Sequence, residues 1–216
     1  MDLLESFAES CNASFANLGL SISVDKMNEV ANSLLFNQTL PTKFTTAKSQ
    51  FSLSNTDSQW QIGATAIGQG NTVISPIHAA MLVSAIANGG TLMKPYVIDR
   101  ITDAEGEVVE QYEPAEYKTL LSESDASVLQ EYMRYVVEEG TATKLKSDSY
   151  EAAGKTGSAE FSSSSDATHS WFVGYAHNGE EPDIAVAVIV ENSGVGSEYA
   201  VPIAKQIFDA YYTWEN

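Results

Sequence analysis

Four consecutive residues, Lys155–Thr156–Gly157–Ser158, place a cation and two hydroxyl groups on a short segment with no side chain at its third position. A lysine presents a point of positive charge to an anion, and the neighbouring hydroxyls add hydrogen-bond donors. A glycine within a strand leaves room for another group to approach the backbone closely. The segment therefore predicts a strand that holds an extended ligand bearing a carboxylate.

The same residues partly fit a phosphate-binding loop, which requires a glycine, four further residues and then Gly-Lys-Ser/Thr. Gly154–Thr156 match that pattern, but Ser149 stands where its first glycine belongs. A phosphate-binding loop also opens a helix, whereas here a serine-rich stretch, Ser162–Ser165, and a strand pattern over His169–Tyr175 follow. This context disfavours a nucleotide site. A solvated lysine on the edge of a sheet is the remaining alternative.

A second polar group, Ser10 and Asn12, lies near the N-terminus. Asp2 is a suitable N-cap for a first helix, and a hydrophobic pattern that closes at Gly19 predicts a second. Serine and asparagine favour turns because their side chains compete for backbone hydrogen bonds. Ser10 and Asn12 are therefore expected on a tight connection between two helices, where the alternative is that they serve only as caps.

Hydrophobic periodicity predicts the elements that must position these residues. In chain order we expect a mainly helical portion over residues 1–90, a hairpin over 91–113, a helix over 122–140, and antiparallel strands with a closing helix over 150–216. Within the first portion, residues 37–61 are polar and aperiodic, which indicates a long loop. The closing helix is expected to cover the sheet with Ile203, Ile207, Phe208 and Tyr211. The fold class is therefore α+β, an antiparallel sheet covered by helices.

Composition limits the classes of partner and site. The formal net charge of -18 over 216 residues argues against nucleic acid as a partner, because a polyanion is repelled. Cys11 is the single cysteine, which leaves no disulfide framework within the chain. His78, His169 and His177 lack the spacing of metal ligands, so we expect neither a metal site nor a cofactor. No stretch has the length of a membrane span, and no targeting signal is present.

Several segments together resemble one protein family. Ser10-Cys11-Asn12 resembles the Ser-x-Asn motif, and Lys155–Gly157 the Lys-Thr-Gly motif, of penicillin-binding proteins and serine β-lactamases. Further segments resemble penicillin-binding transpeptidase domains in the same order: Ala66–Gly70 with Ser75–Pro76, Ala87–Gly90 with Lys94–Pro95, Gly140–Thr141, Ala153–Glu160 and His169–Tyr175. The resemblance covers essentially the whole chain.

The resemblance implies acyl transfer on the D-alanyl-D-alanine end of a peptidoglycan stem peptide, with stem peptides and β-lactam antibiotics as partners. In that chemistry Ser10 relays a proton towards the leaving amine, and Asn12 contacts the amide on the acyl side. Lys155 supplies positive potential to the substrate carboxylate, and Thr156–Ser158 form the substrate-binding strand. The backbone N–H of Ser158 supplies half of an oxyanion hole.

The family's nucleophile lies in a Ser-x-x-Lys motif that precedes Ser-x-Asn, and only nine residues precede Ser10 here. Ser23–Lys26 fits the pattern but follows Ser10 and has the character of a helix cap. We therefore expect an incomplete fold: the C-terminal part of a transpeptidase domain, inactive in isolation, whose nucleophile belongs to a missing N-terminal part of the same protein. The resemblance implies that the whole protein is anchored in a bacterial membrane and acts at its extracytoplasmic face. A β-lactam sensor or a non-catalytic scaffold of the same fold is the alternative.

Overall fold

The computed structural model describes residues 1–160, 168–179 and 181–214, so the serine-rich stretch Ser162–Ser165 lies outside the described residues. Its elements are, in chain order, α1 (Leu3–Ala8), α2 (Asn12–Ser21), α3 (Val24–Ser33), α4 (Gln59–Ala66), α5 (Pro76–Ala87), β1 (Thr91–Met93), β2 (Arg100–Thr102), β3 (Val108–Gln111), β4 (Glu116–Thr119), α6 (Glu123–Glu138), the 3-10 turn η1 (Thr143–Leu145), β5 (Glu151–Glu160), β6 (Thr168–His177), β7 (Ile184–Val190) and α7 (Ala200–Trp214). None of the helices in these ranges is long and apolar enough to cross a membrane.

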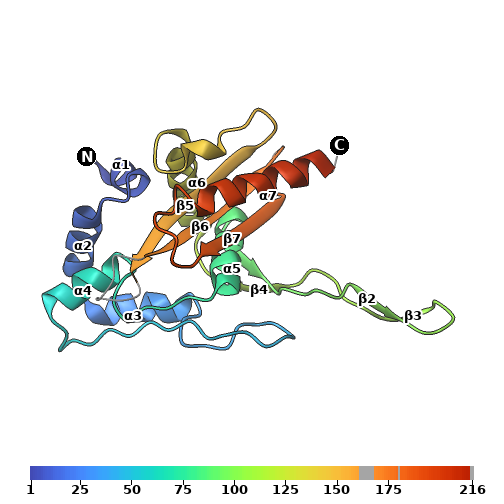
Figure 1. Ribbon diagram of the computed structural model, residues 1–216. Helices are drawn as coiled ribbons and strands as arrows, with labels where there is room; N and C mark the ends of the chain where they lie inside the picture. Colours follow the sequence, from blue (N-terminus) through green and yellow to red (C-terminus); the bar gives the residue numbers. More distant parts are fainter. Residues whose placement is uncertain (161–167, 180, 215–216) are drawn as a thin grey trace.

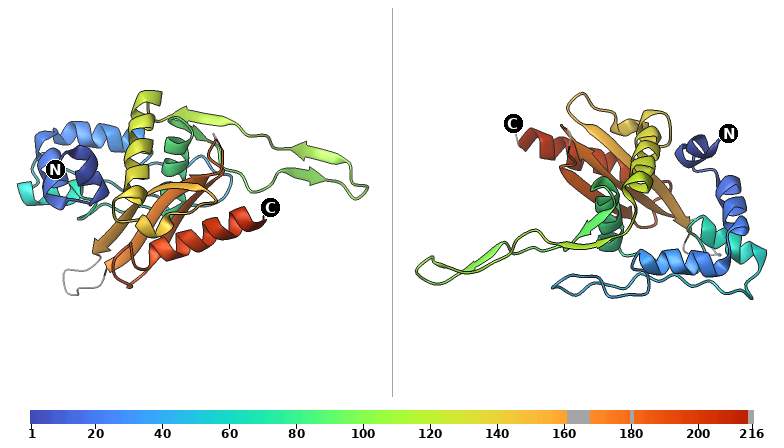
Figure 2. Two further views of the ribbon diagram at one scale, coloured as in Figure 1. Left: turned by 90° about the horizontal axis from the view of Figure 1, so that it is seen from above. Right: turned by 180° about the vertical axis from the view of Figure 1, so that it is seen from behind.

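A three-stranded antiparallel sheet of order β5-β6-β7 forms the centre of the molecule. β5 pairs with β6 along its whole length, from Glu151 opposite His177 to Glu160 opposite Thr168. α7 packs on one face of the sheet, while α5 and α6 pack on the other (Figures 1 and 2). This arrangement confirms the predicted α+β class. β5, which carries Lys155, is an edge strand of the sheet.

The core under α7 explains a glycine beside the predicted site. Phe172 on β6 and Phe208 on α7 are fully buried in the same cluster. Gly154 lies directly over the Phe172 ring, and a methyl group at Gly154 would also approach the Val173 carbonyl oxygen to 2.7 Å. Gly154 is therefore required for packing, and it brings the backbone of β5 close to β6 immediately before Lys155.

The N-terminal helices differ in two respects from the expectation. α2 continues past Gly19, which instead packs its bare backbone against Ala66 of α4. The polar segment 37–61 does not remain a loop to its end, because α4 begins at Gln59 with Ser58 as its N-cap, accepting a hydrogen bond from the Gln61 N–H. This eight-residue helix has few large apolar side chains and little hydrophobic periodicity, and its packing against α2 stabilises it.

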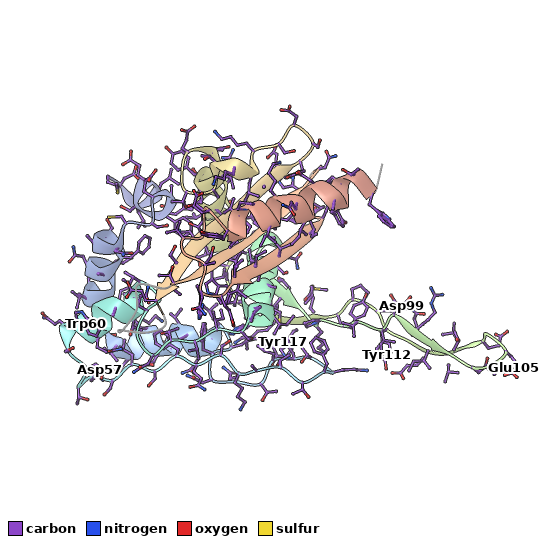
Figure 3. All side chains as sticks on the ribbon, viewed as in Figure 1. Asp57, Trp60, Asp99, Glu105, Tyr112 and Tyr117 are labelled. Atoms are coloured by element: carbon purple, nitrogen blue, oxygen red, sulfur yellow. The ribbon has the colours of Figure 1, made fainter. Side chains whose placement is uncertain are left out.

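The predicted hairpin is part of a longer arm that projects from the body of the molecule (Figures 2 and 3). β1 pairs with β4 at its base, and β2 pairs with β3 further out, so the paired region extends to Thr119 rather than ending at 113. Asp103 forms the turn by accepting hydrogen bonds from the N–H groups of Glu105 and Glu107, and Gly106 has a φ of 90°. Glu105 marks the far end of the arm in Figure 3.

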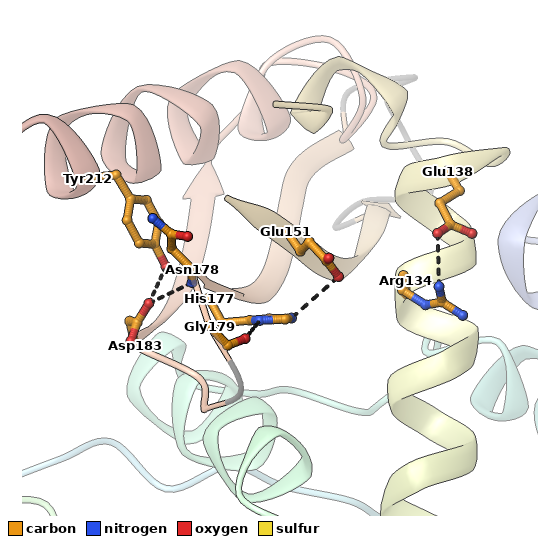
Figure 4. Close-up of polar contacts among 8 residues, drawn as sticks. All are labelled: Arg134, Glu138, Glu151, His177, Asn178, Gly179, Asp183 and Tyr212. Carbon is orange, nitrogen blue, oxygen red and sulfur yellow. Dashed lines mark hydrogen bonds and ion pairs between the residues drawn. The ribbon is translucent and has the colours of Figure 1, made fainter. Parts of the chain in front are cut away.

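Polar contacts hold α7 to the end of the sheet where β5 begins and β6 ends (Figure 4). The Tyr212 hydroxyl donates to Asp183 Oδ2 at 2.9 Å, and the Asn178 backbone N–H donates to the same oxygen at 2.9 Å. His177 belongs to this end of the sheet too, with Nδ1 2.7 Å from the Gly179 carbonyl oxygen and Nε2 3.8 Å from Glu151. The hydrogen bond from Tyr212 to Asp183 ties the last turns of α7 to the residue that precedes β7.

α7 covers the sheet as predicted, and two of the four expected residues, Phe208 and Tyr211, pack against the core, whereas the two isoleucines do not. Phe208 and Tyr212 are buried together with Ala200, Val201 and Ala204. Ile203 and Ile207, which the sequence analysis placed against the sheet, are 40% and 37% exposed. The buried stripe of α7 runs through the small residues Ala200 and Ala204 to Phe208, and Ile203 and Ile207 lie beside this stripe, partly exposed to solvent.

Replacing Phe208 or Ile203 tests this orientation. Phe208→Ala is expected to lower the free energy of unfolding by about 3–5 kcal/mol, because it empties a fully buried site. Ile203→Ala, on the same helix, is expected to cost less than about 1 kcal/mol because the side chain is largely solvated. Urea denaturation of both variants measures the difference. Equal losses would show that the helix is turned as the sequence alone suggested.

Candidate active site

A cleft of about 560 Å³ lies between the α1–α2 connection and the edge strand β5. Its walls combine apolar and hydroxyl-bearing side chains with one lysine. They are Phe7, Ser10, Asn12, Phe15, Ala66, Ile67, Gln69, Thr141, Lys155, Thr156, Gly157, Ser158, Val195, Gly196 and Ser197. All six predicted site residues thus line one cleft.

Ser10 lies on the tight connection that the sequence predicts. Its φ of 55° is in the left-handed region, which is uncommon for a residue other than glycine and is often retained where a side chain must be held in one direction. The turn is closed by the Cys11 N–H, which donates to the Ser6 carbonyl at 2.9 Å. Cys11 is the N-cap of α2 and Asn12 is its first residue, so neither Ser10 nor Asn12 serves as the N-cap.

Lys155 joins the two walls of the cleft. Its Nζ donates hydrogen bonds to Ser10 Oγ and, at 3.1 Å, to the Thr156 carbonyl oxygen. The Phe7 ring lies beside the ammonium group, with 5.7 Å between Nζ and the ring centroid. Burial in these surroundings lowers the pKa of Lys155 to about 8. Lys155 is therefore not the solvated edge-strand lysine of the alternative interpretation.

Thr156 and Ser158 lie two residues apart on β5 and so share one face of the strand, opposite Lys155. Thr156 Oγ1 is 2.6 Å from Thr141 Oγ1, and Ser158 Oγ accepts a hydrogen bond from the Gly196 N–H at 3.1 Å. Because β5 is an edge strand, groups on both of its faces reach the same cleft. An extended ligand lying along this edge would meet the ammonium group and both hydroxyls.

Gly157 lies where another part of the chain approaches the backbone of β5 closely. The loop between β7 and α7 passes close to it, and a methyl group at Gly196 would come within 2.6 Å of the Gly157 carbonyl oxygen. A methyl group at Gly157 would lie 3.2 Å from Trp171 Cβ. The close approach that the sequence predicted at Gly157 is thus made in part by this loop.

The strand geometry also decides against the phosphate-binding alternative. Gly154–Gly157 lie in the middle of a continuous strand rather than before a helix. The three histidines lie on α5 and at the two ends of β6, and among the described residues no cluster of side chains could hold a metal ion. His78 instead contacts the Leu34 carbonyl oxygen through Nε2 at 2.8 Å, and its burial lowers its pKa.

Three features of the cleft were not assigned by sequence reasoning: Phe7 beside Lys155, Thr141 beside Thr156, and Gln69. The Gln69 side chain donates to the Ser158 carbonyl oxygen at 3.3 Å and so ties the end of α4 to β5. Gln69 and Thr141 belong to segments that resembled the family, but their contacts join positions far apart in the sequence. Periodicity and spacing carry no information on such pairs.

Comparison with known proteins agrees with this geometry. The sequence model of the penicillin binding protein transpeptidase domain matches residues 1–209. The chain is 28% identical over 212 residues to the peptidoglycan D,D-transpeptidase PbpA of Mycolicibacterium smegmatis, covering 95% of this chain and 43% of that protein. It is 28% identical over 218 residues to penicillin-binding protein 3 of Bacillus subtilis, covering 97% of this chain and 31% of that protein.

Solved structures show the same likeness in three dimensions. The D,D-transpeptidase domain of a peptidoglycan glycosyltransferase from Eggerthella lenta superimposes with a TM-score of 0.87 at 28% identity, covering 98% of this chain and 54% of that one. The imipenem acyl-enzyme complex of penicillin-binding protein A from Mycobacterium tuberculosis superimposes with a TM-score of 0.88 at 28% identity. The match covers 98% of this chain and 47% of that one. The chain thus spans less than half the length of the curated relatives named above.

The buried lysine predicts a particular dependence of stability on pH. Below pH 8 both the native and the unfolded chain carry the Lys155 proton, and the native state bears the full cost of the buried charge. Between about 8 and the ordinary value of 10.5 the unfolded chain binds more protons, so the free energy of unfolding rises with pH. Lys155→Met is therefore expected to stabilise the fold relative to the parent chain most strongly below pH 8, and less as the pH approaches 10.5.

Denaturation at a series of pH values, compared between the two chains, measures this effect. Lys144→Met is the matched control, because Lys144 is 49% exposed and pairs with Glu198 at the surface. A difference between Lys155→Met and the parent that stays constant from pH 6 to 10 would contradict the buried cation.

Proposed function

This chain belongs to the penicillin-binding protein transpeptidase domain family, and on this premise we propose that it is part of a serine-type peptidoglycan D,D-transpeptidase. Such an enzyme cross-links stem peptides by acyl transfer and is acylated by β-lactams. The observation that carries the proposal is the contact between Lys155 and Ser10, which unites the two family motifs in one cleft. Its relatives include the peptidoglycan D,D-transpeptidase PbpA and a structure of penicillin-binding protein A acylated by imipenem.

We infer that the nucleophile lies outside these 216 residues. Ser23–Lys26 is the segment that fits Ser-x-x-Lys, but the Ser23 hydroxyl accepts a hydrogen bond from the Lys26 N–H and so caps α3. Lys26 pairs with Glu29 at the surface, and neither Ser23 nor Lys26 lines the cleft. A serine and lysine supplied by another segment of the same protein would complete the site between Ser10 and β5.

The proposed roles follow from the contacts in the cleft. An incoming serine attacks the carbonyl carbon of the penultimate D-alanine, and the bond to the terminal D-alanine breaks. Lys155, with a pKa of about 8, holds a proton that Ser10 can pass to the leaving amine. The Ser158 N–H stabilises the oxyanion, and Asn12, beside Ser10 at the start of α2, contacts the acyl-side amide. The resulting ester then reacts with the amine of a second stem peptide.

The terminal carboxylate of the stem peptide, or of a β-lactam, would lie beside Thr156 and Ser158. Both hydroxyls have a protein partner, Thr141 and the Gly196 N–H respectively, and both line the cleft. Lys155 supplies the positive charge from the opposite face of β5. An extended peptide along an edge strand is a common mode of recognition, in which backbone groups give affinity and side-chain contacts give specificity.

A β-lactam sensor of this fold would share the acylation step, whereas a scaffold would need none of these groups. The buried lysine favours the catalytic interpretation over a scaffold, because burial of a charge lowers stability and serves no packing purpose. A sensor differs in the second step, since it stays acylated and transfers nothing to an amine.

We propose that the whole protein lies at the extracytoplasmic face of a bacterial membrane, where peptidoglycan stem peptides are cross-linked.

Labelling of the full-length protein with a fluorescent penicillin tests the proposal. The unsubstituted protein is expected to be acylated, and Lys155→Met to reduce the acylation rate by about 100-fold or more, the usual effect of removing one electrostatic stabiliser of a transition state. Lys144→Met, on the surface, is the matched control and should react like the parent. Release of D-alanine with formation of a dimeric stem peptide separates a transpeptidase from a sensor.

The isolated 216-residue chain is expected not to gain a penicilloyl adduct at neutral pH. Ser23 caps α3 outside the cleft, and Lys155, which contacts Ser10, keeps its proton below its pKa of about 8 and so is a poor base. Intact-mass spectrometry after incubation with penicillin measures this directly. A stoichiometric adduct that disappears in Ser23→Ala would show that Ser23 is the nucleophile, and would overturn the assignment of that role to another segment.

A further inference from the structure

Thr141 touches both walls of the cleft, although it belongs to neither family motif. It follows the end of α6, where the Gly140 N–H donates to the Val136 carbonyl oxygen at 3.2 Å. Its hydroxyl lies 2.6 Å from Thr156 Oγ1 on β5. Its backbone N–H donates to the Ala8 carbonyl oxygen at 3.3 Å, at the end of α1. Ala8 precedes Ser10 by two residues, so Thr141 contacts the strand with its side chain and the serine loop with its backbone.

Gly140 permits this double contact. A methyl group at Gly140 would come within 2.6 Å of the Ala8 carbonyl oxygen and 3.0 Å of its Cβ. Ala8 itself is 1% exposed, so it has no free space into which to move. The end of α1 is therefore pressed against residues 140–141, and Thr141 is held at a fixed position between Ala8 and Thr156.

Only one of the two hydroxyl protons can lie between Thr141 Oγ1 and Thr156 Oγ1, so in this hydrogen bond one hydroxyl donates and the other accepts. A carboxylate is an acceptor only. When a carboxylate lies beside Thr156, the Thr156 proton must point to the ligand, and Thr156 Oγ1 can then only accept from Thr141. A ligand without the negative charge gains less from this ordering, because hydrogen bonds to ionised acceptors are roughly twice as strong as neutral ones.

We propose that Thr141 is a positioning residue that orients the Thr156 hydroxyl towards the carboxylate of the substrate, and so gives the site its preference for a carboxylate over a neutral ester. This inference rests on the proposed function, since it deepens the specificity of that same cleft. Lys155 attracts the negative charge, while the Thr141–Thr156 pair gives direction to one hydrogen bond. Ser158 has a separate donor, the Gly196 N–H, and is independent of Thr141.

The test uses the full-length protein and two probes, benzylpenicillin and its methyl ester, with acylation followed by intact mass. Thr141→Val keeps the shape of the side chain and removes its hydroxyl. It is expected to slow acylation by benzylpenicillin about fivefold, the value of one hydrogen bond of ordinary strength, and to leave acylation by the ester unchanged. Thr141→Ser is expected to restore the preference. Thr143→Val is the matched control, because Thr143 is exposed and lies outside the cleft.

Each outcome distinguishes the two proposals. If the unsubstituted protein is not acylated by either probe, the proposed function is wrong and the role of Thr141 is wrong with it. The unsubstituted protein could instead react while Thr141→Val slows acylation by both probes equally. Thr141 would then support the structure of the cleft without discriminating between a carboxylate and an ester, and only this inference would be overturned. If Thr141→Val slows benzylpenicillin selectively but Thr141→Ser does not restore the rate, the hydroxyl is not the responsible group, and the inference is overturned as well.

Discussion

A lysine that is buried against the side chain of a distant serine constrains the rest of this structure. Lys155 and Ser10 are separated by 145 residues, yet their contact requires the α1–α2 connection to lie over the edge strand. A buried ammonium group lowers stability unless its surroundings hold it firmly. The left-handed turn at Ser10, the aromatic ring of Phe7 and the carbonyl oxygen of Thr156 together provide those surroundings.

Small residues make this arrangement possible at each point where two backbones must meet. Gly154 lies over Phe172 within the sheet, Gly140 lies against Ala8, and Gly19 lies against Ala66 between α2 and α4. Each lacks the methyl group that would separate the elements. Each also adjoins a residue of the cleft wall, since Gly154 precedes Lys155, Gly140 precedes Thr141 and Gly19 packs on Ala66. The polar groups of the site are thus positioned mainly by close backbone packing, with hydrogen bonds from Thr141, Gln69 and Gly196 fixing individual atoms.

Sequence reasoning selected six residues that line one cleft, because a cation, hydroxyl groups and glycine occur together on short segments of the sequence. It also predicted the antiparallel strands and α5, whose Ser75-Pro76 start is a strong local signal. It failed where tertiary packing decides: α4 has no clear hydrophobic face, and the stripe that α7 turns to the sheet depends on Ala200 and Ala204 rather than on the larger isoleucines. The contacts of Thr141 with Thr156 and of Gln69 with Ser158 could not be predicted for a similar reason, because a hydrogen bond between residues far apart in the sequence produces no periodic sequence pattern.

The arm of β2 and β3 has a consequence for how this domain can vary. Residues 96–111 are exposed along nearly their whole length, and none of them lines the cleft. Partway along the arm, Lys43 lies 3.8 Å from the centroid of the Tyr112 ring and 3.8 Å from a carboxylate oxygen of Glu110 (Figure 3). Insertions, deletions and changes of charge in the outer part of the arm are therefore free of the geometric demands on the cleft. A change of length or sequence at the tip of the arm would leave the positions of Ser10, Lys155 and Thr156 unaltered.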